Sequence, residues 1–168
     1  MSTTLVLGVG NVLLTDEGAG VHAMHCMART FSDLPFTEYL DAGTLSFSLA
    51  ADIGAADNLL VFDAARMGEA PATVRVFEGD AYDEFLKSGR LSVHEVGIAD
   101  LMDIARLEDC LPAQRALIGI EPLDFGWGES PGVRVAAALP HAAALGARLV
   151  RRWTALAGGQ QLSRSLRA

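Results

Sequence analysis

The sequence predicts an α/β fold of three layers, in which a mostly parallel, twisted sheet of about five strands carries helices on both faces. Two observations predict this fold. Short apolar runs typical of buried strands recur along the chain, and stretches of helical periodicity lie between them. The 168 residues suffice for one such domain, expected over residues 1–157, and residues 158–168 are expected to form a flexible tail.

Five segments are predicted as strands because they are apolar throughout or alternate between apolar and polar residues. The most strongly apolar is NLLVFD, at 58–63, as expected of a parallel strand covered on both faces. The segment TVRVFE alternates instead, which is typical of a half-exposed edge strand. The predicted strands are residues 4–9, 36–41, 58–63, 73–78 and 116–120.

Helices are predicted from apolar residues spaced three and four apart and from residues that favour helix ends. Ser92 and Glu95 match a capping box, and Ser130-Pro131 is a typical helix start. Pro140 is expected to kink or split the last helix, and Gly158-Gly159 to end it. The predicted helices are residues 17–31, 45–53, 92–106 and 130–157, and residues 79–89 are predicted as an acidic loop, at most briefly helical.

Composition excludes several classes of protein. The net charge of −8 and the sequence pI of about 4.8 argue against nucleic acid as the main partner, because nucleic-acid binding requires a basic face. Cys26 and Cys110 are far apart and form no C-x-x-C motif, so a disulfide framework is not expected and a reducing compartment fits.

Neither a signal peptide nor a transmembrane helix is expected. The apolar start carries no Lys or Arg and soon reaches Asp16 and Glu17. The most apolar late stretch, residues 133–150, is interrupted by arginines, a proline and a histidine. The sequence therefore predicts a soluble cytoplasmic protein, and we expect a monomer because no apolar stripe exceeds what its own core would use.

Three acids and a histidine are predicted to share one edge of the sheet. Glu17 follows the first strand and its glycine turn, Asp41 and Asp63 end two further strands, and His94 begins a helix. In open α/β sheets, the loops beyond the carboxyl ends of the strands collect the functional groups. Glu17, Asp63 and His94 would supply two carboxylates and one imidazole, a ligand set that suits a divalent metal and leaves positions open.

Each of these residues also has an ordinary structural explanation. An acid at a helix start favours the helix dipole, and an acid at a strand end often caps the next turn. His22 and His25, spaced three apart on the first helix, fit a metal pair but fit a solvated face better. Nucleotide binding is not favoured, because Leu13 replaces the third glycine of the dinucleotide motif and the P-loop lysine is absent.

Six motifs, in this order and spacing, are similar to those of one known family. They are GVGNVLLTDEGAG, LDAGT, VFDA, LSVHEVGIADLM, GIEP and SPGV. Over residues 4–156 the sequence resembles the hydrogenase maturation endopeptidases, which process the large subunit of [NiFe] hydrogenases. It departs from the family at Ala42, where a second glycine is usual, and at Glu129, where an apolar residue is commoner.

The resemblance implies an endopeptidase that removes the C-terminal extension of a nickel-loaded [NiFe] hydrogenase large-subunit precursor. It implies that Glu17, Asp63 and His94 bind the nickel, or another divalent metal in its place, and that Asp41 is a functional acid beside them. The nickel belongs to the substrate and serves as a recognition handle.

The reaction is expected to be metal-assisted hydrolysis of an aspartic type. The sequence offers no Ser-His-Asp arrangement or nucleophile elbow, and Cys26 is expected in the core. Nickel would polarise the carbonyl or activate a water molecule, with Asp41 as base and Glu17 and Asp63 as the other catalytic residues. The alternative is a non-catalytic chaperone that checks for nickel with the same ligands; a spore-type protease of related fold is a weaker alternative.

Overall fold

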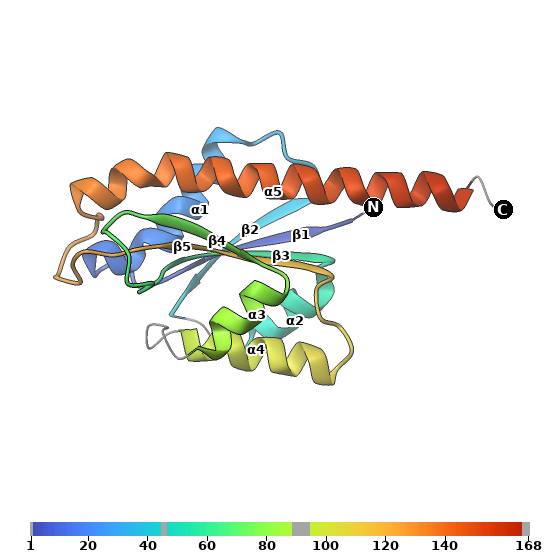
Figure 1. The fold of residues 1–168 in the computed structure, drawn as a ribbon, viewed down its shortest axis with the longest axis horizontal. Helices are drawn as coiled ribbons and strands as arrows, with labels where there is room; N and C mark the ends of the chain where they lie inside the picture. The colour runs from blue at the N-terminus through green and yellow to red at the C-terminus, as the bar shows by residue number, and fades with distance from the viewer. Residues whose placement is uncertain (1, 45–46, 89–94, 166–168) are drawn as a thin grey trace.

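The computed structural model describes residues 2–44, 47–88 and 95–165, and its sheet lies between two layers of helices (Figure 1). The strand order is β2-β1-β3-β5-β4. All neighbouring strands are parallel except β4, which runs antiparallel to β5 at one edge. The strands are β1 (Thr4–Val9), β2 (Thr37–Gly43), β3 (Asn58–Ala64), β4 (Val74–Glu78) and β5 (Gln114–Ile120). The predicted fold class is confirmed.

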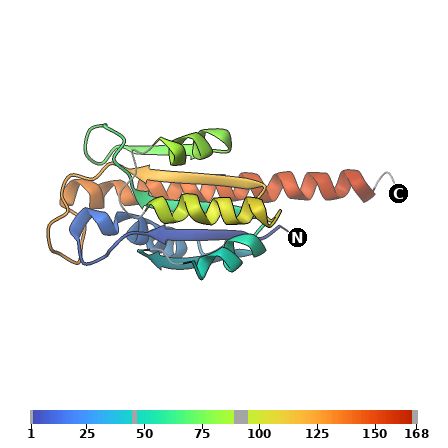
Figure 2. The ribbon, with the colours of Figure 1, turned by 90° about the horizontal axis from the view of Figure 1, so that it is seen from below.

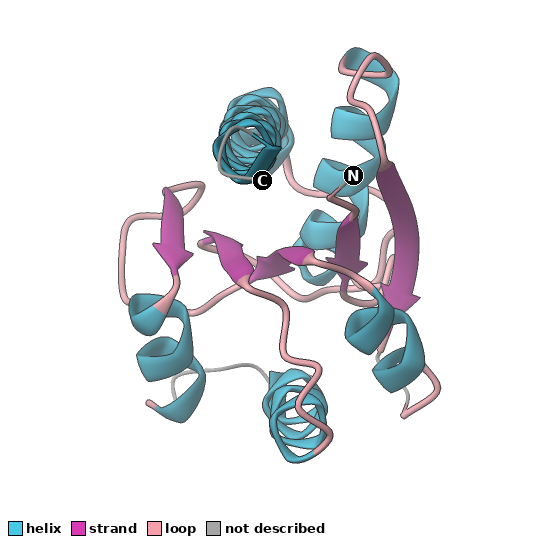
Figure 3. Cartoon of the chain, turned by 90° about the vertical axis from the view of Figure 1, so that its right-hand side faces the viewer, coloured by secondary structure: helices cyan, strands magenta, loops and turns pink. Residues whose placement is uncertain are grey.

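Two helices cover one face of the sheet and three cover the other, as the end-on view shows (Figure 3). The first face packs against α1 (Ala19–Thr30) and α5 (Val133–Ser165). The opposite face packs against α2 (Leu49–Ala55), α3 (Asp80–Lys87) and α4 (Glu95–Leu107). Each layer of helices therefore buries its own apolar cluster, and the central strands are covered on both faces. In β3 all seven residues are buried, as its apolar sequence predicts.

Several predicted helix boundaries are wrong. Glu17 lies in a 3₁₀ turn, η1 (Thr15–Gly18), before α1 begins. The second helix begins at Leu49 and runs through Gly54, and the segment predicted as an acidic loop forms α3. Tyr82, Phe85 and Leu86 explain α3, because their spacing places all three in the core. The predicted capping box at Ser92 lies outside the described residues.

The last helix, α5, is longer and more continuous than expected. It begins at Val133, passes through Pro140 without being split, and continues past Gly158-Gly159 to Ser165. Figure 2 shows its carboxyl-terminal half extending beyond the sheet. Residues 133–159 are long and apolar enough to cross a membrane by length and composition alone. Burial of one face of the helix against the sheet accounts for much of that apolar character, including the fully buried Trp153.

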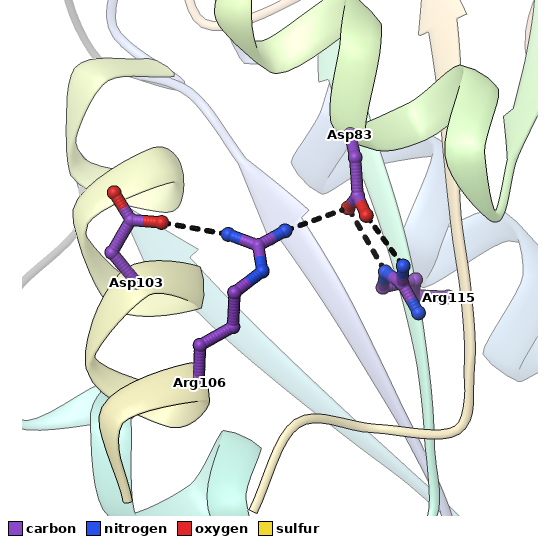
Figure 4. A network of polar contacts seen from close by, with 4 residues as sticks. All are labelled: Asp83, Asp103, Arg106 and Arg115. Carbon is purple, nitrogen blue, oxygen red and sulfur yellow. Dashed lines mark hydrogen bonds and ion pairs between the residues drawn. The ribbon is translucent and has the colours of Figure 1, made fainter. Parts of the chain in front are cut away.

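A network of charged side chains ties α3 and α4 to β5 (Figure 4). Asp83 accepts from Arg115 at 2.9 Å (Nε) and 2.5 Å (Nη2), and Arg106 Nη2 lies 3.2 Å from the same carboxylate. Arg106 also donates to Asp103 at 2.6 Å. The hydrogen bonds from Arg115, and the nearby charges of both arginines, hold the pKa of Asp83 below its usual value. The network lies on the face of the sheet that α3 and α4 cover, away from the edge of the sheet that carries Glu17. Its role is therefore structural.

Candidate active site

The candidate site lies where the chain reverses its direction of travel across the sheet. From β1 the chain crosses to β2 on one side and then to β3 on the other, so β1 and β3 flank the switch point. In open α/β sheets this point leaves a crevice at the carboxyl ends of the strands, where ligands bind. Glu17 follows β1, and Asp63 is the penultimate residue of β3. The topology therefore brings two of the predicted site residues to the switch point.

Glycines allow the η1 turn and α1 to approach the strand ends closely. A Cβ on Gly20 would lie 2.3 Å from the carbonyl oxygens of both Val9 and Phe62, and 2.8 Å from the Cα of Asp63. Gly10 has a φ of +129°, and a Cβ there would lie 1.9 Å from the carbonyl oxygen of Glu17. The helix can start directly against β3 only without these side chains, and this contact brings the turn that carries Glu17 to the strand ends.

The two acids at the switch point differ in environment from Asp41. Asp63 is buried, with 3% of its surface exposed, and Glu17 is half-buried with its Oε2 atom out of contact with solvent. Asp41 is exposed near the end of β2, and its Oδ1 accepts from the backbone N–H of Gly43 at 2.9 Å. The Asp41 carboxylate is thus oriented by the backbone and reachable from solvent, as a base that acts on a bound peptide must be.

Asp16 fastens the η1 turn to the loop between β5 and α5. Its side chain is 1% exposed. Its Oδ2 accepts from the backbone N–H groups of Leu123 (2.8 Å) and Asp124 (3.1 Å), and its Oδ1 accepts from that of Gly132 (2.7 Å). The neighbouring Thr15 donates from its hydroxyl to the Asp124 carbonyl at 2.9 Å. The sequence alone did not show this role, because it joins residues more than one hundred positions apart.

A second buried acid, Glu121, holds the segment after β3. Its Oε2 accepts from the backbone N–H groups of Met67 (2.7 Å) and Glu69 (3.1 Å). Beside it lies an open cleft of about 430 Å³, where the Arg66 guanidinium stacks 4.7 Å above the centre of the Phe125 ring. Arg66 comes three residues after Asp63, so this cleft adjoins the candidate site and offers a cation and apolar surface to a bound chain.

His22 is more buried than a solvated helix face predicts. It is half-buried, whereas His25 is exposed as expected for a solvated helix face. Burial, and then the neighbouring His25, lower the pKa of His22 below its usual value, although a hydrogen bond to the Glu129 backbone and the charge of Asp41 oppose the shift. The imidazole is therefore neutral at pH 7, and neutral imidazole is the form that accepts a proton.

The predicted metal-ligand set is only partly visible. The start of α1, next to the turn that carries Glu17, lies against the end of β3 that carries Asp63. His94 lies outside the described residues. Within residues 2–44, 47–88 and 95–165, no three His, Cys, Asp or Glu side chains are grouped so as to hold a metal ion. The assignment of Glu17, Asp63 and His94 as a nickel site, and of Asp41 as a catalytic acid, remains a prediction.

Comparison with known proteins identifies the family. A sequence model described as hydrogenase maturation protease matches residues 21–145, a span that contains Asp41, Asp63 and position 94. The chain belongs to the hydrogenase maturation protease family. It is 34% identical over 162 residues to the hydrogenase expression/formation protein HoxM of Cupriavidus necator, covering 96% of this chain and 78% of that protein. It is 33% identical over 119 residues to the hydrogenase 2 maturation protease of Escherichia coli, covering 70% of this chain and 72% of that protein.

Solved structures of this family share the fold. The hydrogenase maturating endopeptidase HybD of Escherichia coli superposes with a TM-score of 0.80 at 27% identity, covering 89% of this chain and 93% of that one. HybD from Thermococcus kodakarensis, a [NiFe] hydrogenase maturation protease, gives a TM-score of 0.75 at 27% identity, covering 88% and 99%. This maturation protease is therefore a hydrolase, an endopeptidase that acts in hydrogenase maturation.

Proposed function

We propose that the protein cuts the C-terminal extension from the large-subunit precursor of a [NiFe] hydrogenase after nickel has been inserted. The observation that supports this proposal is the place of Glu17 after β1 and of Asp63 near the end of β3, the two strands that flank the switch point of a maturation-protease fold. Carboxylate oxygens at this place in the fold are suitable ligands for the nickel that the precursor carries.

The chemistry of the donor set fits this substrate. Carboxylate oxygens and one imidazole nitrogen bind divalent first-row metals, and three protein ligands leave room for the ligands that the precursor itself contributes. In this proposal the nickel of the substrate is bound by Glu17, Asp63 and His94. An unloaded precursor would lack the handle and would not be held at the site.

Asp41 is proposed as the base that activates the attacking water. Its exposure leaves it accessible to a water molecule and a bound peptide, and the Gly43 N–H fixes one of its oxygens. The nickel of the substrate would polarise the scissile carbonyl, and the charges of Glu17 and Asp63 would hold that metal in place. No covalent intermediate with the protein is required.

A cleavage assay tests the proposal directly. The wild-type protein is mixed with nickel-loaded and with nickel-free precursor, and loss of the extension is followed by mass spectrometry. Cleavage is expected only with nickel, and Glu17→Gln, Asp63→Asn and His94→Ala are each expected to abolish it. Nickel-dependent binding without cleavage would instead support a chaperone that checks for nickel. Cleavage that proceeds equally well without nickel would rule out the handle.

The base role has its own test. Asp41→Asn is expected to lower the cleavage rate by at least about a hundredfold, as is typical for loss of a general base, while nickel-dependent binding of the precursor is retained. An unchanged rate would remove Asp41 from the mechanism.

We further propose that the protein acts as a cytoplasmic monomer, which its two free cysteines suit. Light scattering that shows a stable dimer would contradict the monomer.

A further inference from the structure

The outer edge of β2 is an unpaired sheet edge that ends at the candidate site. β2 is the terminal strand of the sheet, and among the described residues no strand pairs with its outer side. The Phe36 carbonyl accepts from the Thr4 N–H at 2.9 Å, so Phe36 is one of the residues whose backbone faces β1. Because a parallel ladder alternates, the N–H and C=O groups of Thr37, Tyr39 and Asp41 face outward.

This edge lacks three of the features that commonly block pairing with another chain. Edge strands are commonly blocked by lysine, proline or an early bulge. The strand reads TEYLDAG, which contains no Lys, Arg or Pro, and its one register shift lies at the carboxyl end, after Asp41. The opposite edge, β4, is shorter and carries Arg75 within its five residues.

The edge is acidic along its length. A cleft of about 460 Å³ opens at the amino end of β2, lined by Phe36, Glu38 and Asp52 among others, and none of the described residues that line it is Lys or Arg. Glu38, Asp52 and, at the far end of the strand, Asp41 are all exposed. A peptide strand that carries Lys or Arg would complement this charge, and the half-exposed Phe36 offers apolar surface to the stems of those side chains.

We propose that β2 binds an extended, basic segment of the precursor as an added strand and leads that segment to the Glu17–Asp63 pair. This inference rests on the proposed function. Strands in a sheet lie about 4.8 Å apart, so an added strand would lie about 14 Å from β3, three spacings away. Four or five extended residues beyond the paired segment, at about 3.3 Å each, span that distance.

The test uses a synthetic peptide that covers both sides of the cleavage position in the precursor. Two further peptides each carry N-methyl groups on two residues that are two positions apart. The methylated positions of the second peptide are shifted by one residue relative to those of the first. An added strand directs only every second N–H toward β2. One methylated peptide is therefore expected to bind about thirtyfold more weakly and the other to bind as the parent does. By NMR, the Thr37, Tyr39 and Asp41 amides should exchange more slowly with peptide bound.

Charge is tested with a matched pair of variants. Glu38→Gln is expected to weaken peptide binding and to reduce its salt dependence, whereas Glu84→Gln, an exposed acid on α3, is expected to change neither. Equal effects of the two methylation patterns, unchanged exchange at the three amides, or no binding at millimolar peptide would each overturn strand addition. Cleavage of the precursor under any of those outcomes would leave the proposed function standing. If peptide binding depends on which alternate residues are methylated but the loaded precursor is not cleaved, strand addition would stand and the proposed function would fail.

Discussion

The substitution Asp16→Asn isolates the contribution of the acid that fastens the η1 turn to the loop after β5. The carboxylate accepts hydrogen bonds from three backbone N–H groups, at 2.7–3.1 Å. An amide can keep its oxygen toward Leu123 and Asp124, but its NH₂ group would then face the Gly132 N–H. Two charge-assisted bonds become neutral ones, and one buried donor is left without an acceptor. Together these changes cost about 3 kcal/mol.

Urea unfolding measures this cost. With a slope of about 2 kcal/mol per molar urea, the midpoint should fall by about 1.5 M with the slope unchanged. Asp124→Asn is the matched control, because that side chain is exposed on the same loop, and its midpoint should not move. A loss below about 1 kcal/mol for Asp16→Asn would refute the reasoning, since it would mean that water replaces the carboxylate at little cost.

Three further substitutions test other parts of the fold. Asp83→Asn should cost about 2 kcal/mol at pH 7. Because the pKa of Asp83 is lowered in the folded protein, this contribution is complete above the unfolded pKa and is lost as the pH falls through the folded pKa, so the urea midpoints of the two proteins should converge in acid. Gly20→Ala should prevent stable folding or lower the free energy of unfolding by more than about 3 kcal/mol, since the added Cβ meets two backbone oxygens at 2.3 Å. Thermal melting measures this loss, and a mild effect would mean that α1 can shift off the strand ends. Gly158→Ala should instead stabilise the protein by about 0.7 kcal/mol in the same melts, because alanine favours a helix and the added Cβ would meet no atom within 4 Å. A loss of stability would argue against a helix at this position.

The sequence predicted the layers and the strands because those depend on local apolar patterns. All five strands lie where the runs of apolar residues indicated, within two residues at each end. The α3 helix was missed because its charged residues hide an apolar face of only three side chains. The end of α5 was misplaced because Gly158 and Gly159 each cost only about 1 kcal/mol in a long helix, which is too little to end it.

The candidate site was predictable in part. The turn that carries Glu17 and the strand end that carries Asp63 could be placed at one edge of the sheet, because the carboxyl ends of parallel strands share that edge. The roles of Asp16 and Glu121 could not be foreseen, because both acids bind backbone groups of distant segments. The environment of His22 could not be foreseen either, because the Glu129 backbone to which it hydrogen-bonds comes from a distant part of the sequence.

The loop between β5 and α5 is pinned to the η1 region at three regularly spaced points. Leu123 and Asp124 bind Asp16, Gly128 exchanges backbone hydrogen bonds with Leu13 and Thr15, and Gly132 binds Asp16 again. Between these points lie two short spans, and Trp127 in the first is 86% exposed. Exposed side chains on these spans can change without displacing the η1 turn, because backbone hydrogen bonds and the Asp16 carboxylate hold it. Gene duplicates are therefore free to diverge at these positions while the frame around Glu17 stays constant.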